Sequence, residues 1–172
     1  MFDYEYITKN EIDLIKEASH MLKISWKESY KNILNSSYLS SLDDNHWTEF
    51  IKNNLLNKSI KCIIAKYNNT IIGVSIFGKS ITKEFPNSGE VISLYVLNEF
   101  KGNKIGYTLF TKAIFELKNQ NFKDIIICVF KDNTTAINFY KSHGFTVVQN
   151  NLTTLIGNED LPYIIMQRKS QP

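Results

Sequence analysis

Hydrophobic positions recur at helical spacing through the first third of the chain. A short strand is predicted at Tyr4–Ile7, and residues 8–11 read Thr-x-x-Glu, a pattern typical of a helix start. Apolar and aromatic residues then repeat at near-helical spacing over residues 12–33, which predicts an amphipathic helix. A break is expected at Asn35–Ser37, and a second helix is predicted over Asp43–Asn57.

The rest of the chain alternates short apolar runs, typical of strands, with two amphipathic stretches. The predicted strands are Lys61–Tyr67, Ile71–Phe77, Glu90–Leu97, Asp124–Phe130, Phe145–Leu155 and Tyr163–Gln167. A turn at Asn68–Asn69 joins the first two into a hairpin. One helix follows the loop Asn98–Gly106 and ends near Asn119, and another is capped by Asp132–Asn133 and ends near His143–Gly144. This order predicts one α/β domain over residues 1–172, with a mostly antiparallel start and a parallel crossover.

Composition and charge are those of an ordinary globular protein. Of the 172 residues, 43% are hydrophobic and 22% are charged, which excludes disorder as the default. A chain of this length buries roughly 70% of its unfolded surface, so it needs no disulfide or metal to fold. The net charge is only +3, and Arg168 is the sole arginine among the 20 basic residues. A nucleic-acid partner is therefore not expected.

The cysteines and the hydrophobic runs indicate a cytoplasmic protein. Cys62 and Cys128 each lie in an apolar run and are expected to be buried, reduced thiols, with an inter-strand disulfide as the open alternative. No Cys/His spacing resembles a zinc site, so no metal is expected. Residues 1–10 lack a signal-peptide pattern, and no apolar run approaches the roughly 20 residues of a membrane span. We therefore expect no membrane partner.

A loop that bears glycines and lysines joins a buried strand to an amphipathic helix. It reads Lys101-Gly102-Asn103-Lys104-Ile105-Gly106. Glycine lets a backbone approach a ligand closely, and the free N–H groups at a helix start favour a phosphate group, as does the helix dipole. The two lysines add positive charge. A purely structural turn is the alternative, because the loop is neither a Walker A motif nor a dinucleotide-binding fingerprint.

A second segment is more specific. From Asn133 to Phe145 the sequence reads Asn-x-x-Ala-x-x-Phe-Tyr-x-x-x-Gly-Phe. Together with the preceding loop, which resembles a pyrophosphate loop of the form Gln/Arg-x-x-Gly-x-Gly/Ala, it resembles the GNAT superfamily of acyl-CoA N-acyltransferases. The resemblance covers about Lys61 to Lys169. Two lysines depart from it: Lys101 stands where the family mostly has Arg or Gln, and Lys104 stands where it usually has its first glycine.

The resemblance implies a fold and a coenzyme site. The fold is a single GNAT-like α/β (α+β) domain with a mixed, mostly antiparallel sheet of about six to seven strands, about four helices, and a splayed central pair at 90–97 and 124–130, the first with a bulge. Residues 60–169 form the acetyl-CoA-binding core, and residues 1–59 form the variable helices on the acceptor side. The residues implied to bind acetyl-CoA are Leu94, Tyr95, Val96, Lys101, Gly102, Asn103, Lys104, Ile105, Gly106, Tyr107, Asn133, Ala136, Phe139 and Tyr140.

The resemblance also implies the reacting groups. Tyr140 matches the tyrosine that protonates the leaving thiolate; a packed core aromatic is the alternative. Glu90 stands where many relatives place a base for the amine, and a solvated acid at a strand end is the alternative. Trp26, Tyr30 and Tyr95 are expected to line the acceptor pocket, where aromatic rings suit a cationic amine, and a proton-transfer role is the alternative for Tyr95. Core packing is the alternative for Trp26.

These features favour an acetyl-CoA-dependent N-acetyltransferase. By the resemblance, it transfers an acetyl group directly to a primary amine of a small molecule, such as a polyamine or an amino acid. The segment 157–166 is loosely similar to small bacterial polyamine (spermidine/spermine) acetyltransferases. Two alternatives remain open: acetylation of a protein N-terminus or lysine, and a non-catalytic module that binds acyl-CoA. A homodimer is also open, since relatives often pair through their last strands.

Overall fold

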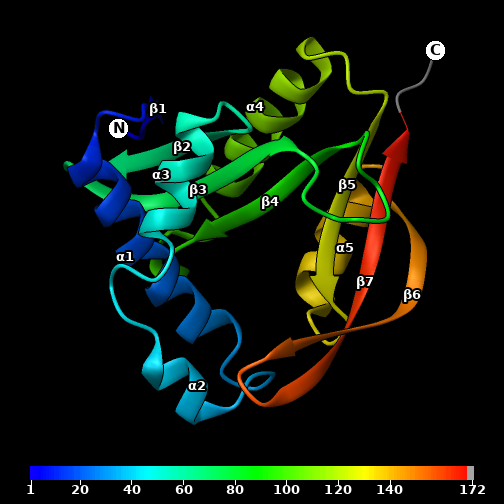
Figure 1. Ribbon diagram of the computed structural model, residues 1–172. Helices are drawn as coiled ribbons and strands as arrows, with labels where there is room; N and C mark the ends of the chain where they lie inside the picture. Colours follow the sequence, from blue (N-terminus) through cyan, green and yellow to red (C-terminus); the bar gives the residue numbers. More distant parts are fainter. Residues whose placement is uncertain (170–172) are drawn as a thin grey trace.

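The computed structural model describes residues 1–169, which contain one mixed sheet of seven strands in the order β1-β2-β3-β4-β5-β7-β6 (Figure 1). All neighbouring strands are antiparallel except β4 and β5. The predicted mixed sheet with a parallel crossover is thus confirmed. The strands are β1 (Asp3–Ile7), β2 (Ile60–Tyr67), β3 (Thr70–Lys79), β4 (Gly89–Val96), β5 (Asp124–Phe130), β6 (Thr146–Ile156) and β7 (Glu159–Lys169).

Helices cover both faces of this sheet (Figure 1). α1 and α3 pack on one face of β2, β3 and β4, whereas α4 and α5 share a hydrophobic core on the other face. The short helix α2 packs against the β6–β7 hairpin. The helices of residues 1–169 are α1 (Ile12–Ser29), α2 (Ser36–Ser41), α3 (Thr48–Leu56), α4 (Ile105–Asn119), α5 (Thr134–Ser142) and a 3-10 turn, η1 (Asn98–Phe100).

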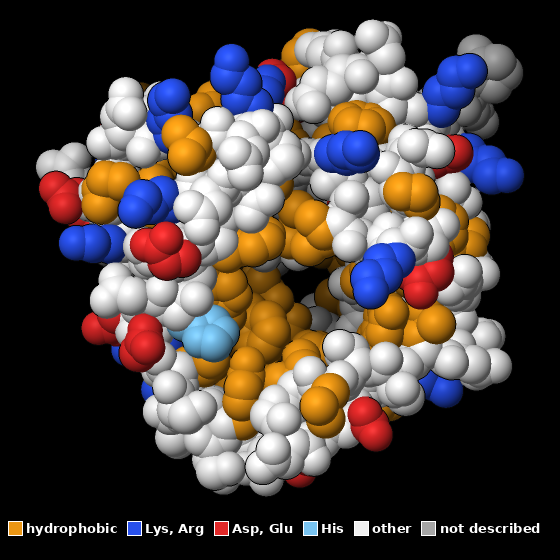
Figure 2. All heavy atoms as spheres, in the orientation of Figure 1, with side chains coloured by type: hydrophobic (Ala, Val, Ile, Leu, Met, Phe, Trp, Pro, Cys, Tyr) orange, Lys and Arg blue, Asp and Glu red, His pale blue; other side chains and the backbone are white. Residues whose placement is uncertain are grey.

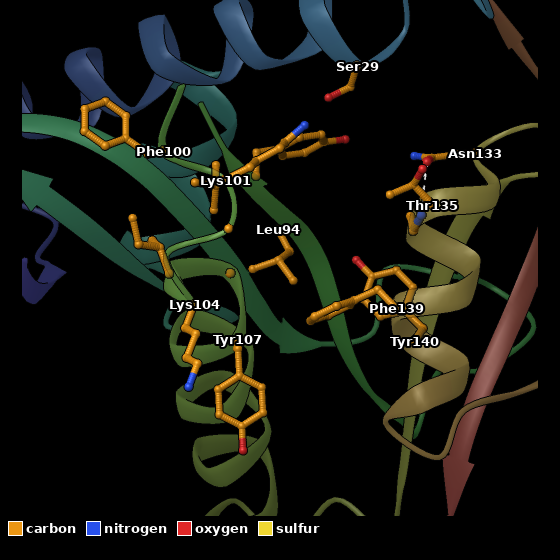
Figure 3. Close-up of a pocket in the computed structure, with 16 residues that line it drawn as sticks. Ser29, Leu94, Phe100, Lys101, Lys104, Tyr107, Asn133, Thr135, Phe139 and Tyr140 are labelled. Carbon is orange, nitrogen blue, oxygen red and sulfur yellow. Dashed lines mark hydrogen bonds between the residues drawn. The ribbon is translucent and has the colours of Figure 1, made fainter. Parts of the chain in front are cut away.

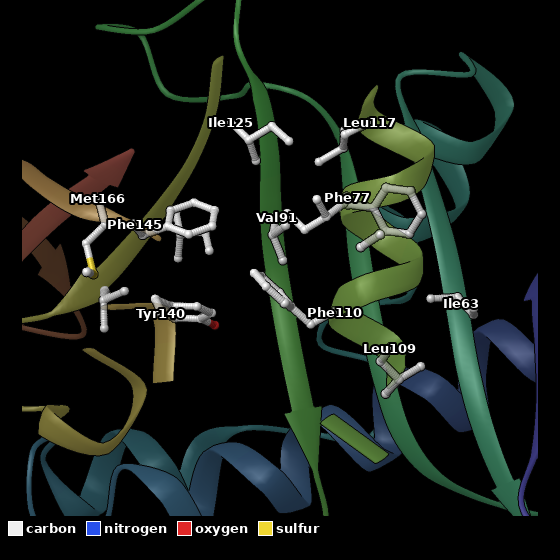
Figure 4. Close-up of a cluster of buried hydrophobic side chains, with 14 of the residues drawn as sticks. Ile63, Phe77, Val91, Leu109, Phe110, Leu117, Ile125, Tyr140, Phe145 and Met166 are labelled. Carbon is white, nitrogen blue, oxygen red and sulfur yellow. The ribbon is translucent and has the colours of Figure 1, made fainter. Parts of the chain in front are cut away.

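The core under α4 and α5 lies on one face of the sheet and contains residues both from β2 to β4 and from β5 and β7 (Figure 4). In α4 the fully buried positions Leu109, Ala113 and Leu117 recur every four residues, so the sequence periodicity sets the face that packs on the strands. Phe110 packs near Tyr140, with their ring centroids 5.8 Å apart. This core holds α4 and α5 together behind the middle of the sheet.

The first third of the chain differs from its sequence prediction. α1 begins at Ile12 as predicted, after a turn in which the Thr8 backbone N–H donates to the Glu11 carboxylate at 2.7 Å, but it ends at Ser29 and not at residue 33. The expected break at 35–37 instead starts α2, because the Asn35 side chain accepts the Ser37 N–H at 2.8 Å. The helix predicted over 43–57 begins only at Thr48. Short Asp and Asn side chains compete with the helical backbone and favour caps and turns, as Asn35 does here and as Asp43 does by accepting the Asn45 N–H at 2.7 Å.

The central strands β4 and β5 diverge after a short paired stretch (Figure 1). They pair only at Gly89 with Ile125 and at Glu90 with Ile126. On the other side of β4, Ser93 pairs with Ile76 while Val91 pairs with Phe77, so Ile92 is an extra residue. Such a β-bulge bends its strand and increases the local twist. The expected bulge and splayed central pair are therefore confirmed.

The two cysteines lie in different environments, and no disulfide joins them. Cys62 is buried, as predicted. The prediction of burial was wrong for Cys128, which is exposed although both its neighbours, Ile127 and Val129, are buried. Successive strand residues face opposite sides of a sheet, so Cys128 points away from the face on which Ile127 and Val129 pack in the core with α4 and α5. None of the helices in residues 1–169 is long and apolar enough to span a membrane.

Candidate active site

A cavity of about 520 Å³ lies between the second half of β4, the start of α4 and the start of α5 (Figure 3). Ser29, Phe100 and Thr135 line it without having been predicted; Thr135 could have been found, because it lies two positions after Asn133 near the start of α5. Asn103 is absent from the lining, since its side-chain amide donates to the Phe100 carbonyl at 3.1 Å. The predicted residues that line the cavity are Leu94, Tyr95, Val96, Lys101, Gly102, Lys104, Ile105, Gly106, Tyr107, Asn133, Ala136, Phe139 and Tyr140.

The start of α4 faces this cavity. Lys104 takes the left-handed conformation, with φ 60° and ψ 10°, directly before the first helical residue. The Thr108 N–H donates to the Lys104 carbonyl at 2.9 Å, so the three preceding N–H groups have no carbonyl within the helix to bind. Together with the positive end of the helix dipole, such N–H groups favour an anion.

Lysines add charge to this helix start. Lys104 is exposed, and its side chain runs beside Tyr107 along the first turn of α4 (Figure 3). Lys101 donates a hydrogen bond to the Asn98 side chain. Both lysines line the cavity, so the loop places positive charge and a set of backbone N–H donors at one end of it.

α5 brings Tyr140 to the other end of the cavity. The Asn133 side chain caps α5 by accepting the Ala136 N–H at 3.2 Å, as the sequence predicts. The Tyr140 ring is buried against Phe110, Phe139 and Phe145, with its hydroxyl on the cavity side (Figure 3). Burial raises the pKa of Tyr140 above its ordinary value, and the nearby Tyr30 adds to the shift. The hydroxyl is therefore a neutral proton donor at physiological pH.

A smaller cavity of about 50 Å³ continues the first one into the gap between β4 and β5. Five residues line both cavities, so the two are neighbours along one path: Leu94, Tyr95, Asn133, Ala136 and Tyr140. Tyr30, Cys128 and residues 91–93 line only the smaller cavity. The splayed strands thus connect the start of α4 with a narrow space beside the Tyr140 hydroxyl.

Glu90 lies outside the lining of both cavities. It is buried at the paired end of β4, and its carboxylate holds the loop after β3. It accepts the Ser80 hydroxyl at 2.8 Å, the Ile81 N–H at 2.9 Å, and the Thr82 N–H and hydroxyl at 3.2 Å each. These bonds give Glu90 a task in loop structure, and its role as a general base remains a prediction.

The three residues predicted for the acceptor pocket form one aromatic cluster. The Tyr30 ring lies 5.0 Å from Trp26, and its hydroxyl is 2.7 Å from that of Tyr95. Phe130, which the sequence analysis missed, packs 5.1 Å from Tyr30; its place at the end of the predicted strand 124–130, three residues before Asn133, was the available signal. The face seen in Figure 2 is hollowed near its centre, with hydrophobic side chains around the opening.

Comparisons with known proteins identify the family. A model of the acetyltransferase (GNAT) family matches residues 26–145. A spermidine N(1)-acetyltransferase from Thermoplasma acidophilum is 26% identical over 149 residues, covering 82% of this chain and 88% of that protein.

Two solved structures share the fold. The PaiA N-acetyltransferase from Thermoplasma acidophilum, in complex with coenzyme A, has a TM-score of 0.77 and 23% identity, and covers 98% of this chain and 99% of that one. YncA, a putative acetyltransferase from Salmonella typhimurium with its cofactor acetyl-CoA, has a TM-score of 0.73 and 17% identity, covering 100% and 95%. The chain therefore belongs to the GNAT family and is an N-acetyltransferase.

Proposed function

We propose that this protein transfers an acetyl group from acetyl-CoA directly to a primary amine of a small molecule, such as a polyamine or an amino acid. One observation carries the proposal: the splayed gap between β4 and β5 connects an anion-binding helix start to the buried Tyr140 hydroxyl. The relative named as a spermidine N(1)-acetyltransferase, at 26% identity, supports a small amine as the acceptor.

The residues of the larger cavity fit acetyl-CoA. The N–H groups at the start of α4, with Lys101 and Lys104, would hold the pyrophosphate. Beyond Glu90, the edge of β4 that faces β5 has no pairing partner, and Leu94 to Val96 line the cavity there. The amide groups of the pantetheine arm can pair with such an edge as an added strand does. A cavity of about 520 Å³ is also within the usual range for cofactor sites.

The chain would contribute positioned donors to the reaction. Acetyl-CoA supplies an activated thioester when bound. Backbone N–H groups of β4 near Leu94 and Val96 would polarise the thioester carbonyl and stabilise the developing oxyanion. The amine nitrogen would bond to the carbonyl carbon as the C–S bond breaks, and Tyr140, neutral and at the inner end of the path, would protonate the departing sulfur. The proton that the amine nitrogen releases would then restore the Tyr140 hydroxyl, through Glu90 as the predicted base or through solvent.

Cys128 supports direct transfer over a covalent acyl-enzyme. Although the residue is exposed, its thiol lines the narrow cavity, and desolvation there raises the pKa of the thiol to about 11. A hydrogen bond with the Thr82 hydroxyl lowers this pKa in part, and the charges of Glu90 and Glu84 raise it further. The thiolate is the nucleophilic form of cysteine, so Cys128 is almost entirely in its unreactive thiol form at neutral pH. An acetyl group would therefore pass to the amine without resting on this residue.

The test combines binding with turnover. Isothermal titration with acetyl-CoA comes first, and an absence of binding at millimolar acetyl-CoA would contradict the proposal. Release of free thiol, followed with DTNB, is then compared for polyamines, amino acids and peptides. We expect steady release with a small amine. Preference for peptides would indicate a protein acceptor, and binding without release for any amine would indicate a non-catalytic acyl-CoA-binding module.

A further inference from the structure

Three tyrosines line the smaller cavity, which joins the larger one. Tyr30 follows the last residue of α1, Tyr95 comes from β4 and Tyr140 from α5. Tyr95 and Tyr140 line both cavities, and Tyr30 lines the smaller one. The proposed chemistry uses only the Tyr140 hydroxyl, which leaves the other two hydroxyls without a chemical task.

The Tyr30 and Tyr95 hydroxyls form a bridge between elements that are distant in sequence. Their oxygens are 2.7 Å apart, and either can be the donor. Asn133 lines the same small cavity as Tyr30 and Tyr95, and the Trp26 ring lies 6.5 Å from that of Tyr95. Because Asn133 caps α5, the hydroxyl pair joins the end of α1 to β4 beside the first turn of α5.

This bridge lies where the sheet itself provides no connection. Within the described sheet, β4 and β5 pair only at Gly89 and Glu90, and the hydroxyl pair lies beyond that point, toward the open end of the gap. The Tyr30 side chain is 6% exposed, between the rings of Trp26 and Phe130. A buried hydroxyl that loses its partner is costly, so the surroundings favour an intact bridge.

We propose that the Tyr30–Tyr95 hydroxyl pair positions Tyr140 for acetyl transfer, by fixing the start of α5 against β4 across the open end of the gap. Tyr30 is thus a positioning residue that acts through Asn133 and α5. The inference rests on the proposed function. Burial raises the pKa of both Tyr30 and Tyr95, so the two hydroxyls keep their protons, and the bridge persists, across the physiological pH range.

Phenylalanine variants test the bridge because they keep the rings and remove only the hydroxyls. Tyr30→Phe is expected to lower kcat about tenfold and to leave the KM for acetyl-CoA within about twofold. Tyr95→Phe should behave alike. The double variant should lose no more than either single variant, since all three remove one shared bond. Single losses that multiply to about a hundredfold in the double variant, or an unchanged kcat in Tyr30→Phe, would overturn the inference.

Tyr38→Phe is the matched control. Tyr38 belongs to the same aromatic cluster, but its ring packs beside Gly157 in the β6–β7 turn, away from the two cavities. This variant is expected to keep the wild-type kcat. An equal loss of kcat in Tyr38→Phe and Tyr30→Phe would mean that cluster packing, and not the bridge, supports turnover, and it would contradict the inference.

Amide hydrogen exchange at Ala136 gives a readout that needs no turnover. The Ala136 N–H donates to the Asn133 side chain, so its exchange reports on the start of α5. We expect exchange to accelerate at least about threefold in Tyr30→Phe and to stay unchanged in Tyr38→Phe. Faster exchange in a protein whose wild type acetylates no amine would support the bridge and overturn the proposed function. Unchanged exchange in a protein that does turn over would overturn the bridge alone.

Discussion

Tyr140 is the side chain on which the proposed chemistry depends most. Tyr140→Phe is expected to lower kcat at least about tenfold while sparing acetyl-CoA affinity, because the ring still packs on Phe110 while the proton donor is lost. Burial raises the pKa of Tyr140 above its ordinary value of 10.0, so deprotonation of this group should not reduce the wild-type kcat between pH 7 and 10. Steady-state kinetics over that pH range check both points, and an unchanged kcat in the variant would move the acid role elsewhere.

Lys104 combines backbone strain with a useful charge. The left-handed conformation costs an L-residue about 1–2 kcal/mol, and a glycine there would recover part of this energy. Lys104→Gly should therefore raise the free energy of unfolding by about 1 kcal/mol in denaturant titrations without ligand. It should also weaken acetyl-CoA binding and make that binding less sensitive to salt, because one cation near the phosphates is lost.

Lys104→Asn serves as the control for this prediction. Asparagine tolerates the left-handed conformation but carries no charge, so it separates strain from electrostatics. Equal acetyl-CoA affinity in all three proteins would show that Lys104 does not meet the phosphates.

At the level of elements, Glu90 connects β4 to the loop between β3 and β4. A single oxygen, Oε2, accepts most of the bonds from residues 80–82. Glu90→Gln can keep an oxygen there but loses the charge that strengthens these bonds, so we expect the free energy of unfolding to fall by about 1 kcal/mol. Glu84→Gln, an exposed acid in the same loop, should leave stability unchanged.

The same Glu90→Gln variant tests the predicted general base. If Glu90 deprotonates the amine, the acidic limb of the kcat–pH profile flattens in the variant. An unaltered limb, together with the loss of stability, would assign Glu90 to the loop alone. Denaturant titration and kinetics on one preparation therefore separate the two roles.

Across the whole molecule, acetyl-CoA is expected to stabilise the fold because it would contact both sides of the gap. At a ligand concentration of about 100 times Kd, the free energy of unfolding should rise by about 2.7 kcal/mol. Hydrogen exchange should slow at the start of α4, along β4 and at the start of α5. A nucleotide fragment without the pantetheine arm should protect α4 alone; protection of α5 by this fragment would contradict the assigned path.

Much of this arrangement could be predicted from the sequence, because local patterns encode it. Apolar runs predicted the strands β2 to β5. The spacing of Leu109, Ala113 and Leu117 predicted which face of α4 is buried, and the capping residue Asn133 predicted where α5 starts. The bulge and the diverging strands followed only from the family resemblance. α2 was missed because the Asn and Ser residues that start it also favour turns. Its 6 residues are also too few to show a clear helical periodicity.

Other features depend on contacts between distant segments, which no local pattern encodes. The Tyr30–Tyr95 bond joins residues 65 positions apart. The Glu90 carboxylate accepts hydrogen bonds from residues 80–82 because the loop folds back over it. Cys128 is exposed because it points to the sheet face opposite the core with α4 and α5, although its sequence neighbours are those of a buried strand. Tertiary structure alone decides these three environments.

The short pairing of β4 and β5 also makes the sheet mechanically uneven. β2 and β3 pair along eight positions and β5 and β7 along seven, whereas β4 and β5 pair at two. A tensile load applied between β1 and β7 would cross these pairings in series and concentrate at the shortest one. The β4–β5 pairing is therefore the mechanically weakest point of the sheet. A molecule bound along the gap would contact both strands and strengthen the connection between them.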